Sequence, residues 1–260
     1  MGRPKKASRN TFLSRGTAPT YHMSTLSNLR NHLRLFQDRE KAKIYKRFFK
    51  TGPGQYGQGD NFLGLIVPDC HKVAQTYHDM LWGEVKTLLG SSYHEERLIA
   101  LLIMIKQFRR GDQKTKARIY SHYLKSVKYI NNWDLVDLSA PHIVGDYLKD
   151  RRRQPLFQLA KSNNLWKKRI SIMATFPYIK QGEFEMTFRI ADILLKDEHD
   201  LIHKAVGWML REVGKKDRAA LKKFLKTRYH TMPRTMLRYA IERFPSSERK
   251  KYLKRGPPLS

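Results

Sequence analysis

The feature that most constrains the fold is a helical repeat. From about Asp38 onward, apolar residues recur at steps of three and four positions, and very few stretches alternate as a β-strand would. Similar segments return at steps of about 36, 36, 35 and 32 residues, counted between five marker positions: Arg97, Trp133, Arg169, Lys204 and Met236. This period is typical of two-helix repeats, whose units bury their apolar faces by stacking on one another. The sequence therefore predicts an all-α fold, a curved α-solenoid of HEAT-like helical-hairpin repeats.

Glycine and proline residues punctuate this pattern. They fall between the expected helices, for example at Gly111, Pro141, Gly182 and Gly214, where we expect helices to end. Residues 1–37 are different, because they are rich in basic and small polar residues and contain no acidic residue. We expect a basic, mobile N-terminal arm over 1–37, although its last part has some helical spacing. The repeat domain then covers 38–255 and a short tail 256–260.

The charge of the chain indicates a polyanionic partner. It carries 52 Lys and Arg against 23 Asp and Glu, a formal net charge of +29, and nucleic acid is the leading candidate. A membrane surface is the competing partner, but the longest uncharged apolar run, Leu98 to Ile105, is far shorter than the roughly 18 to 20 residues of a spanning helix. The single cysteine, Cys70, excludes an internal disulfide. With no apolar signal segment, we expect a cytoplasmic protein.

Two other patterns carry weak signals. His199 and His203 are four residues apart but lack a plausible third ligand, so we expect no metal site. The glycine-rich stretch from Gly52 to Gly59 lacks the Gly-Lys-Ser/Thr ending of a phosphate-binding loop. We interpret it as a connection that lets backbone approach backbone or DNA.

The segment Asn131-Asn132-Trp133-Asp134-Leu135-Val136-Asp137 carries the clearest sign of chemistry. If it is helical, Trp133 and Asp137 lie on one face and present an aromatic ring and an anion to the same place. In a basic protein, an anion held beside DNA needs a reason. Taken alone, such residues are more often a core tryptophan and a capping or ion-paired aspartate.

The chain from about Ala42 to Lys251 resembles the bacterial DNA alkylation repair glycosylases of the AlkD family, which are built from HEAT-like repeats. The resemblance rests on separated motifs in the same order: Tyr45 to Thr51, Gly54 to Asp60, Phe62 to Gly64, Val67-Pro68, Asn132 to Asp137, Gly145-Asp146, Asn164 to Arg169, and Lys204 to Glu212. It implies hydrolysis of the N-glycosidic bond of N3- and N7-alkylated, cationic purines in duplex DNA. No metal or organic cofactor and no deep flipping of the base are implied.

The resemblance also implies roles for particular residues. The family's catalytic aspartate falls on Asp137, its two cleft tryptophans on Trp133 and Trp208, and its phosphate-binding arginine on Arg169. We expect further DNA contacts from basic residues of the matching motifs: Lys167, Lys168, Lys204 and Arg211. These side chains would line one concave basic groove. A structural salt bridge is the alternative for Arg169, and the Arg151-Arg152-Arg153 cluster has no counterpart in the pattern.

The chemistry is consistent with these residue types. An alkylated purine is already a good leaving group, so most of the barrier is positive charge developing on the sugar. A carboxylate in a partly dehydrated groove stabilises that charge, and it can also position the attacking water.

We therefore expect a monomeric DNA glycosylase, acting in the bacterial cytoplasm on the nucleoid, whose partner is duplex DNA containing alkylated purines. The alternatives are a non-catalytic HEAT-like protein that binds bent or branched DNA, and a helical scaffold for an acidic protein.

Overall fold

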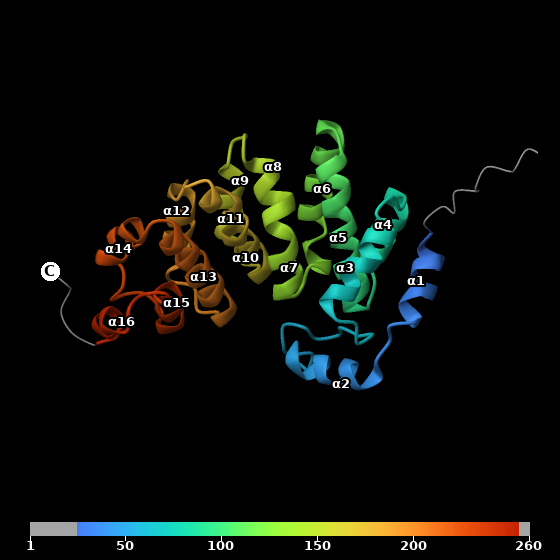
Figure 1. Cartoon of the computed structure of the whole chain (residues 1–260), viewed down its shortest axis with the longest axis horizontal. Coiled ribbons are helices and arrows are strands. Elements are labelled where there is room, and N and C mark those ends of the chain that lie inside the picture. Colours follow the sequence, from blue (N-terminus) through green and yellow to red (C-terminus); the bar gives the residue numbers. More distant parts are fainter. Residues whose placement is uncertain (1–24, 255–260) are drawn as a thin grey trace, which may run out of the picture.

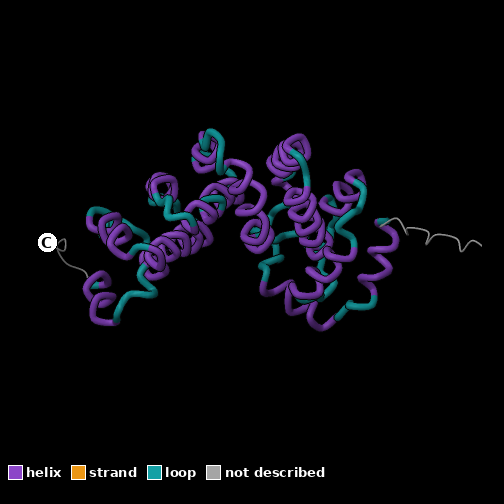
Figure 2. The backbone as a smooth tube through the Cα atoms, turned by 45° about the horizontal axis from the view of Figure 1, so that its top comes forward, coloured by secondary structure: helices purple, strands orange, loops and turns teal. Residues whose placement is uncertain are grey.

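The protein is an all-α, solenoid-like array of stacked helices, as predicted. The structure is a computed structural model that describes residues 25–254. Helices follow one another along the long axis of the molecule, and the described residues contain no strand, only an isolated bridge between Asn61 and Tyr93 (Figures 1 and 2). The helices are α1 (Leu26–Arg34), α2 (Arg39–Phe48), α3 (Val67–Thr76), α4 (Trp82–Leu89), α5 (His94–Arg110), α6 (Gln113–Lys125), α7 (Trp133–Ala140), α8 (Asp146–Leu148), α9 (Gln154–Ala160), α10 (Leu165–Met173), α11 (Phe176–Lys180), α12 (Glu185–Leu194), α13 (Asp200–Lys216), α14 (Arg218–Lys226), α15 (Arg234–Ala240) and α16 (Ser246–Leu253).

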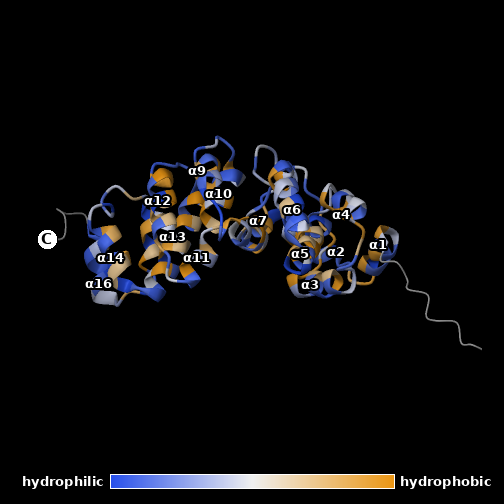
Figure 3. Ribbon diagram, turned by 90° about the horizontal axis from the view of Figure 1, so that it is seen from above, coloured by the Kyte–Doolittle hydropathy of each residue, from blue (hydrophilic) through white to orange (hydrophobic). Residues whose placement is uncertain are grey.

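The repeat seen in the sequence corresponds to one row of helices in this array, which we call the inner row. The five marker residues fall in α5, α7, α10, α13 and α15, and each of these helices contacts the next. A second row, α4, α6, α9, α12 and α14, packs against the first row. Hydrophobic residues lie along the faces where the helices pack (Figure 3). Because the inner helices start near the same edge of the array, their first turns lie side by side.

Two of the expected helix breaks are absent. At Pro141 the backbone stays helical (φ −57°, ψ −40°), and the chain continues through a π-helical turn, Pro141–Gly145, into α8. The fixed φ of proline suits a helical backbone, so Pro141 does not interrupt the helical course of the chain. Gly214 lies inside α13, where a Cβ would come within 2.5 Å of the Leu221 side chain. Glycine is therefore present at this position for packing, and not to end the helix.

The expectation of a mobile arm over the whole of residues 1–37 is wrong in its last part. Residues 26–34 form α1, which Thr25 caps with its side chain. Leu29 and Leu33 are fully buried against α3 and α4, and Arg30 pairs with the buried Glu96. The leucine spacing therefore outweighed the basic composition, because two buried leucines anchor the helix. Residues 1–24 of the predicted arm, residue 255 at the end of the predicted repeat domain, and the predicted tail 256–260 lie outside the described residues.

The glycine-rich connection holds α2 beside the repeats, and its predicted role in close backbone approach is confirmed. A Cβ on Gly57 would lie 2.4 Å from the backbone oxygen of Phe49. Gly64 has a φ of +85°, and its Cβ would lie 2.0 Å from the backbone oxygen of Asp38. The buried carboxylate of Glu95 accepts hydrogen bonds from the N–H groups of Leu63 and Gly64 at 3.0 and 2.8 Å. These contacts place α2 across the first turns of the inner helices.

Within residues 25–254, the structure contains no helix of the length and apolarity needed to cross a membrane.

Candidate functional site

Two adjoining cavities lie between α2 and the N-terminal parts of α5, α7, α10 and α13, and together we call them the cleft. The apolar cavity has a volume of about 410 Å³ and is lined by Tyr45, Phe48, Phe49, Leu65, Val67, His94, Glu95, Leu98, Trp133, Asp134, Asp137, Leu138 and Trp208. The polar cavity has a volume of about 570 Å³ and is lined by Arg47, Phe48, Lys50, Tyr56, Trp133, Asp137, Arg169, Leu201, Lys204, Trp208 and Tyr239. Four residues belong to both: Phe48, Trp133, Asp137 and Trp208. The three residues predicted to be catalytic therefore meet at the junction of the two cavities.

Local helix geometry explains this convergence. Helix α7 begins at Trp133, where the side chain of the buried Asn132 accepts the first backbone N–H, and Asp137 follows one turn later on the same face. Helix α13 repeats the spacing with Lys204 and Trp208. Asn164 caps α10, which carries Arg169 in its second turn. The helix N-termini provide partial positive charge at this edge of the molecule.

Asp137 and Arg169 form a buried ion pair. The guanidinium donates to both carboxylate oxygens of Asp137, at 2.8 Å from Nε and 2.7 Å from Nη2. The two side chains are only 10% and 5% exposed. Arg169 also donates to the backbone oxygen of Leu201, which ties α10 to α13. The salt bridge that the sequence left open as the alternative for Arg169 is thus present, and it fixes the carboxylate of Asp137 in both position and rotation.

Burial raises the pKa of Asp137, although the charge and hydrogen bonds of Arg169 act to lower it. The nearby carboxylate of Asp134 adds to the increase. A carboxylate that is poorly hydrated in this way interacts strongly with any positive charge placed beside it, because little water screens the attraction.

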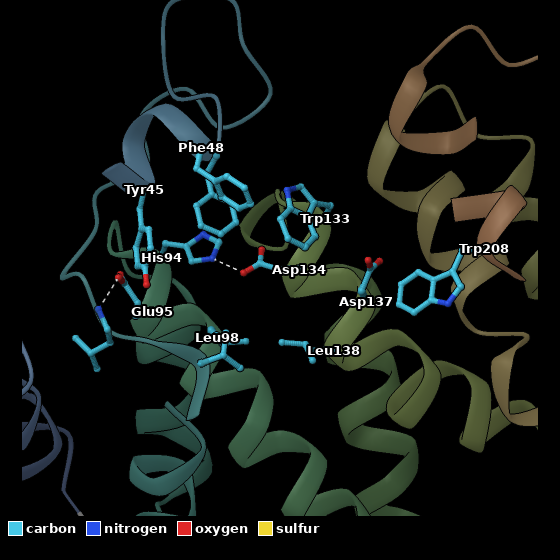
Figure 4. Close-up of a pocket in the computed structure, with 13 residues that line it drawn as sticks. Tyr45, Phe48, His94, Glu95, Leu98, Trp133, Asp134, Asp137, Leu138 and Trp208 are labelled. Carbon is cyan, nitrogen blue, oxygen red and sulfur yellow. Dashed lines mark hydrogen bonds and ion pairs between the residues drawn. The ribbon is translucent and has the colours of Figure 1, made fainter. Parts of the chain in front are cut away.

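Aromatic rings surround the carboxylate. Figure 4 shows Asp137 between the indole rings of Trp133 and Trp208. The ring of Trp133 stacks on Phe49, with ring centroids 5.5 Å apart, and meets the edge of Phe48 at 5.9 Å. Trp208 donates its indole N–H to Glu212 at 3.1 Å, which orients its ring. Aromatic faces attract cations and can pack against a sugar, so they suit the same charge as the carboxylate does.

The polar cavity places positive charge on the side of Asp137 that faces away from the apolar cavity. Arg47 and Lys50 reach it from the end of α2, and Lys204 reaches it from α13. Lys204 pairs with Asp200 at 2.7 Å, and that hydrogen bond is the main cause of its raised pKa. Lys50 has a left-handed backbone (φ 55°), in the place after a helix where glycine is common. A cation therefore occupies a backbone position that costs a non-glycine residue about 1 kcal/mol.

Sequence reasoning did not single out four of these lining residues, namely Arg47, Phe48, Lys50 and Tyr56. All four lie in two segments quoted for the resemblance, Tyr45 to Thr51 and Gly54 to Asp60, so the match of these segments was the available signal. Their periodicity gives no indication of a site, because α2 reaches the cleft only through the glycine-rich connection.

Three of the predicted DNA-binding residues line neither cavity. Lys168 pairs with Asp197 at 2.6 Å, and Arg211 pairs with Glu242. Lys167 is partly exposed on α10. Their contacts with DNA stay predictions that concern the rim of the cleft.

A buried polar network of His94, Asp134, Asp60 and Arg97 borders the apolar cavity, which His94 and Asp134 line. His94 lies 2.8 Å from Asp134 through Nε2 and 3.5 Å from Asp60 through Nδ1, and Arg97 lies 2.7 Å from the same oxygen of Asp60. Burial lowers the pKa of His94, but the two carboxylates outweigh it and raise the pKa to about 9. The imidazolium packs against Phe49 at an angle of 34° between the rings, and Phe49 in turn stacks on Trp133.

Comparison with known proteins identifies the family. The sequence profile of the DNA alkylation repair enzymes matches residues 29–244. A solved structure described as a predicted DNA alkylation repair enzyme from Enterococcus faecalis superposes with a TM-score of 0.62 over 81% of this chain and 97% of that chain, at 13% sequence identity, which shows a shared fold. No curated protein matches the chain. Because the family profile covers most of the sequence, the chain belongs to the DNA alkylation repair enzyme family.

Proposed function

We propose that this protein is a monofunctional DNA glycosylase that hydrolyses the N-glycosidic bond of N3- and N7-alkylated purines in duplex DNA. The observation that carries the proposal is the Asp137 carboxylate, held by Arg169 between two indole rings at the junction of an apolar and a cationic cavity. This arrangement suits a reaction in which positive charge develops on a sugar whose phosphates are bound on one side.

The chemistry follows from the charge of the lesion. An alkylated purine is cationic, so it leaves as a neutral base without needing strong protonation. As the bond lengthens, the deoxyribose acquires positive charge, and the ionised Asp137 stabilises that charge by an attraction that is already oriented. The same carboxylate can accept a proton from the attacking water. Trp133 and Trp208 would pack on the sugar and exclude bulk water.

Arg169 would act chiefly through Asp137. Three of its five N–H groups already donate to Asp137 and to the backbone of Leu201, which leaves two for a phosphate. The resemblance assigned the phosphate to Arg169, with Lys204 among the further DNA contacts. We now propose that Arg47, Lys50 and Lys204 share this role, because they line the polar cavity and retain exposed ammonium or guanidinium groups.

The test is release of damaged bases from methylated duplex DNA by the full chain. We expect the parent protein to release 7-methylguanine and 3-methyladenine, and Asp137→Asn to lose about 10²–10³-fold in rate, the usual effect of removing one preorganised electrostatic group. Asp192→Asn is the matched control. Both carboxylate oxygens of Asp192 also accept hydrogen bonds from Nε and Nη2 of one guanidinium, that of Arg228, but Asp192 lies on α12 and lines neither cavity.

If the parent releases bases no faster than they are released spontaneously, the proposal is contradicted. In that case, retained binding to bent or branched duplexes would favour a non-catalytic DNA-binding protein.

A further inference from the structure

We infer that the edge of the protein opposite the cleft is a second binding surface for duplex DNA. It lies where α5 passes into α6 and where α8 passes into α9, at the upper edge in Figure 1, whereas α2, whose residues line the cleft, is at the lower edge. Six exposed cations gather there and form what we call the edge patch: Arg109, Arg110, Lys114, Arg118, Arg151 and Arg152.

The length of α5 separates the edge patch from the cleft. His94, its first residue, lines the apolar cavity, and Arg109 and Arg110 are its last two residues. Seventeen residues at about 1.5 Å each place these two ends about 25 Å apart. The persistence length of duplex DNA is about 50 nm, so a duplex in the cleft cannot turn back over such a short distance. The edge patch would therefore take a second segment of DNA.

The edge patch is held together by the fold. Arg151 donates to the side chain of Gln113 at 2.6 Å, which fixes the α8–α9 connection to the start of α6. Its guanidinium stacks over Tyr147 at 4.3 Å, and Tyr147 stacks on Tyr120 with ring centroids 4.2 Å apart. Arg118 is likewise stacked, over Trp82 at 4.9 Å. Because these side chains are already ordered, phosphate binding would cost little further entropy.

The charges of the edge patch are not neutralised within the described part of the protein. None of the six cations forms an ion pair there, whereas Arg169 and Lys204 in the cleft do. Three carboxylates lie nearby, those of Asp112, Asp146 and Asp150, so six cations less three anions leave +3. Asp112 is used as the cap of α6. These carboxylates relieve part of the repulsion among the cations, and the remaining positive charge favours an outside anion.

The composition of the edge patch favours a phosphate backbone over an acidic protein. Five of the six cations are arginine, whose planar fork matches phosphate oxygens. A protein interface usually has an apolar centre, but none of the large exposed hydrophobic side chains of the described chain belongs to α6 or to the α8–α9 connection. Arginines without an apolar anchor are typical of contacts with the DNA backbone.

A duplex-bridging assay with the full chain tests this inference. The protein is loaded on an immobilised short duplex, a fluorescent duplex of the same sequence is added, and its retention is measured at several salt concentrations. The patch variant carries Gln at Arg109, Arg110, Lys114 and Arg152, and it leaves the packed Arg151 in place. The control variant carries Gln at four exposed cations of α14 and α16 that form no ion pair in the described chain: Lys223, Lys226, Lys250 and Lys251.

We expect the parent and the control variant to retain the second duplex. The patch variant should bind it at least about tenfold more weakly, with a salt slope reduced by about 0.9 for each phosphate that is no longer neutralised. Equal retention by the two variants would overturn the inference. Two clefts of a dimer could also bridge two duplexes, but that bridging would persist in the patch variant and would therefore give this same result. Displacement by polyglutamate at equal charge would point to an acidic protein and would also overturn it.

The assay is independent of base release. If the cleft does not bind DNA, the parent would hold a single duplex and the patch variant none, which would remove the proposed function and keep the second surface. If the parent and the patch variant each hold one duplex, the second surface is refuted and the proposed function is not affected.

Discussion

Replacing Asp137 by asparagine tests the central contact of the cleft, because it removes one charge of a buried pair and leaves the shape of the side chain. Arg169 donates two hydrogen bonds to Asp137, and the two side chains are 5% and 10% exposed. Removing one partner of a buried ion pair costs about 3–5 kcal/mol, because the other charge remains desolvated. The asparagine oxygen can still accept one of the two hydrogen bonds, so we expect a loss of about 3 kcal/mol.

Thermal unfolding followed by circular dichroism measures this loss. At about 2–4 °C for each kcal/mol in a chain of this size, the midpoint should fall by about 6–12 °C. The double variant Asp137→Asn with Arg169→Met removes both charges, and we expect it to be more stable than the single variant, because no unpaired charge is left buried. Rates of base release are then compared at a temperature where both variants are folded.

Two results would refute this reasoning. A single variant that unfolds at the same temperature as the parent would mean that the pair contributes nothing, so that Arg169 is free to bind phosphate. A double variant less stable than the single one would mean that the cost comes from poorer packing and not from an orphaned guanidinium.

Three further predictions follow from the same contacts. Because burial raises the pKa of Asp137, the rate of base release should rise with pH through a value above the usual 3.9 of aspartic acid, and a rate that is already constant at pH 4 would contradict this role. The pKa of His94 is raised to about 9, so the protonated imidazole should contribute fully to stability below pH 6.5 and cease to contribute as pH rises through 9. Urea unfolding of His94→Gln and of the parent measures this: the difference in their free energies of unfolding should shrink between pH 6.5 and 9. Gly64→Ala should destabilise the protein by several times the roughly 1 kcal/mol expected for Gly54→Ala. Both glycines have positive φ, but only a Cβ on Gly64 would collide with backbone, at Asp38. Equal midpoints of thermal unfolding for the two variants would contradict this packing argument.

Most of the fold could be predicted from local patterns. The three- and four-residue spacing specifies helices wherever one face is buried, and the repeat period follows from the size of a helix pair. For the same reason the pairs Trp133 and Asp137, and Lys204 and Trp208, could be placed on single faces, because four residues make about one turn. The leucine spacing of residues 26–34 also indicates a helix, although the basic and polar composition of the segment favours a mobile arm; the burial of Leu29 and Leu33 decides between the two.

Two features were decided by the tertiary structure alone. Asp137 pairs with Arg169 from a different repeat, 32 residues further along the chain, and no local pattern distinguishes such a pair from a phosphate contact. The cations of α2 reach the cleft because Gly57 and Gly64 let backbone approach backbone, which a glycine-rich stretch permits but does not direct. Periodicity therefore determined which residues share a helix face, whereas the packing between helices decided which faces meet, because those contacts join residues that are far apart in the sequence.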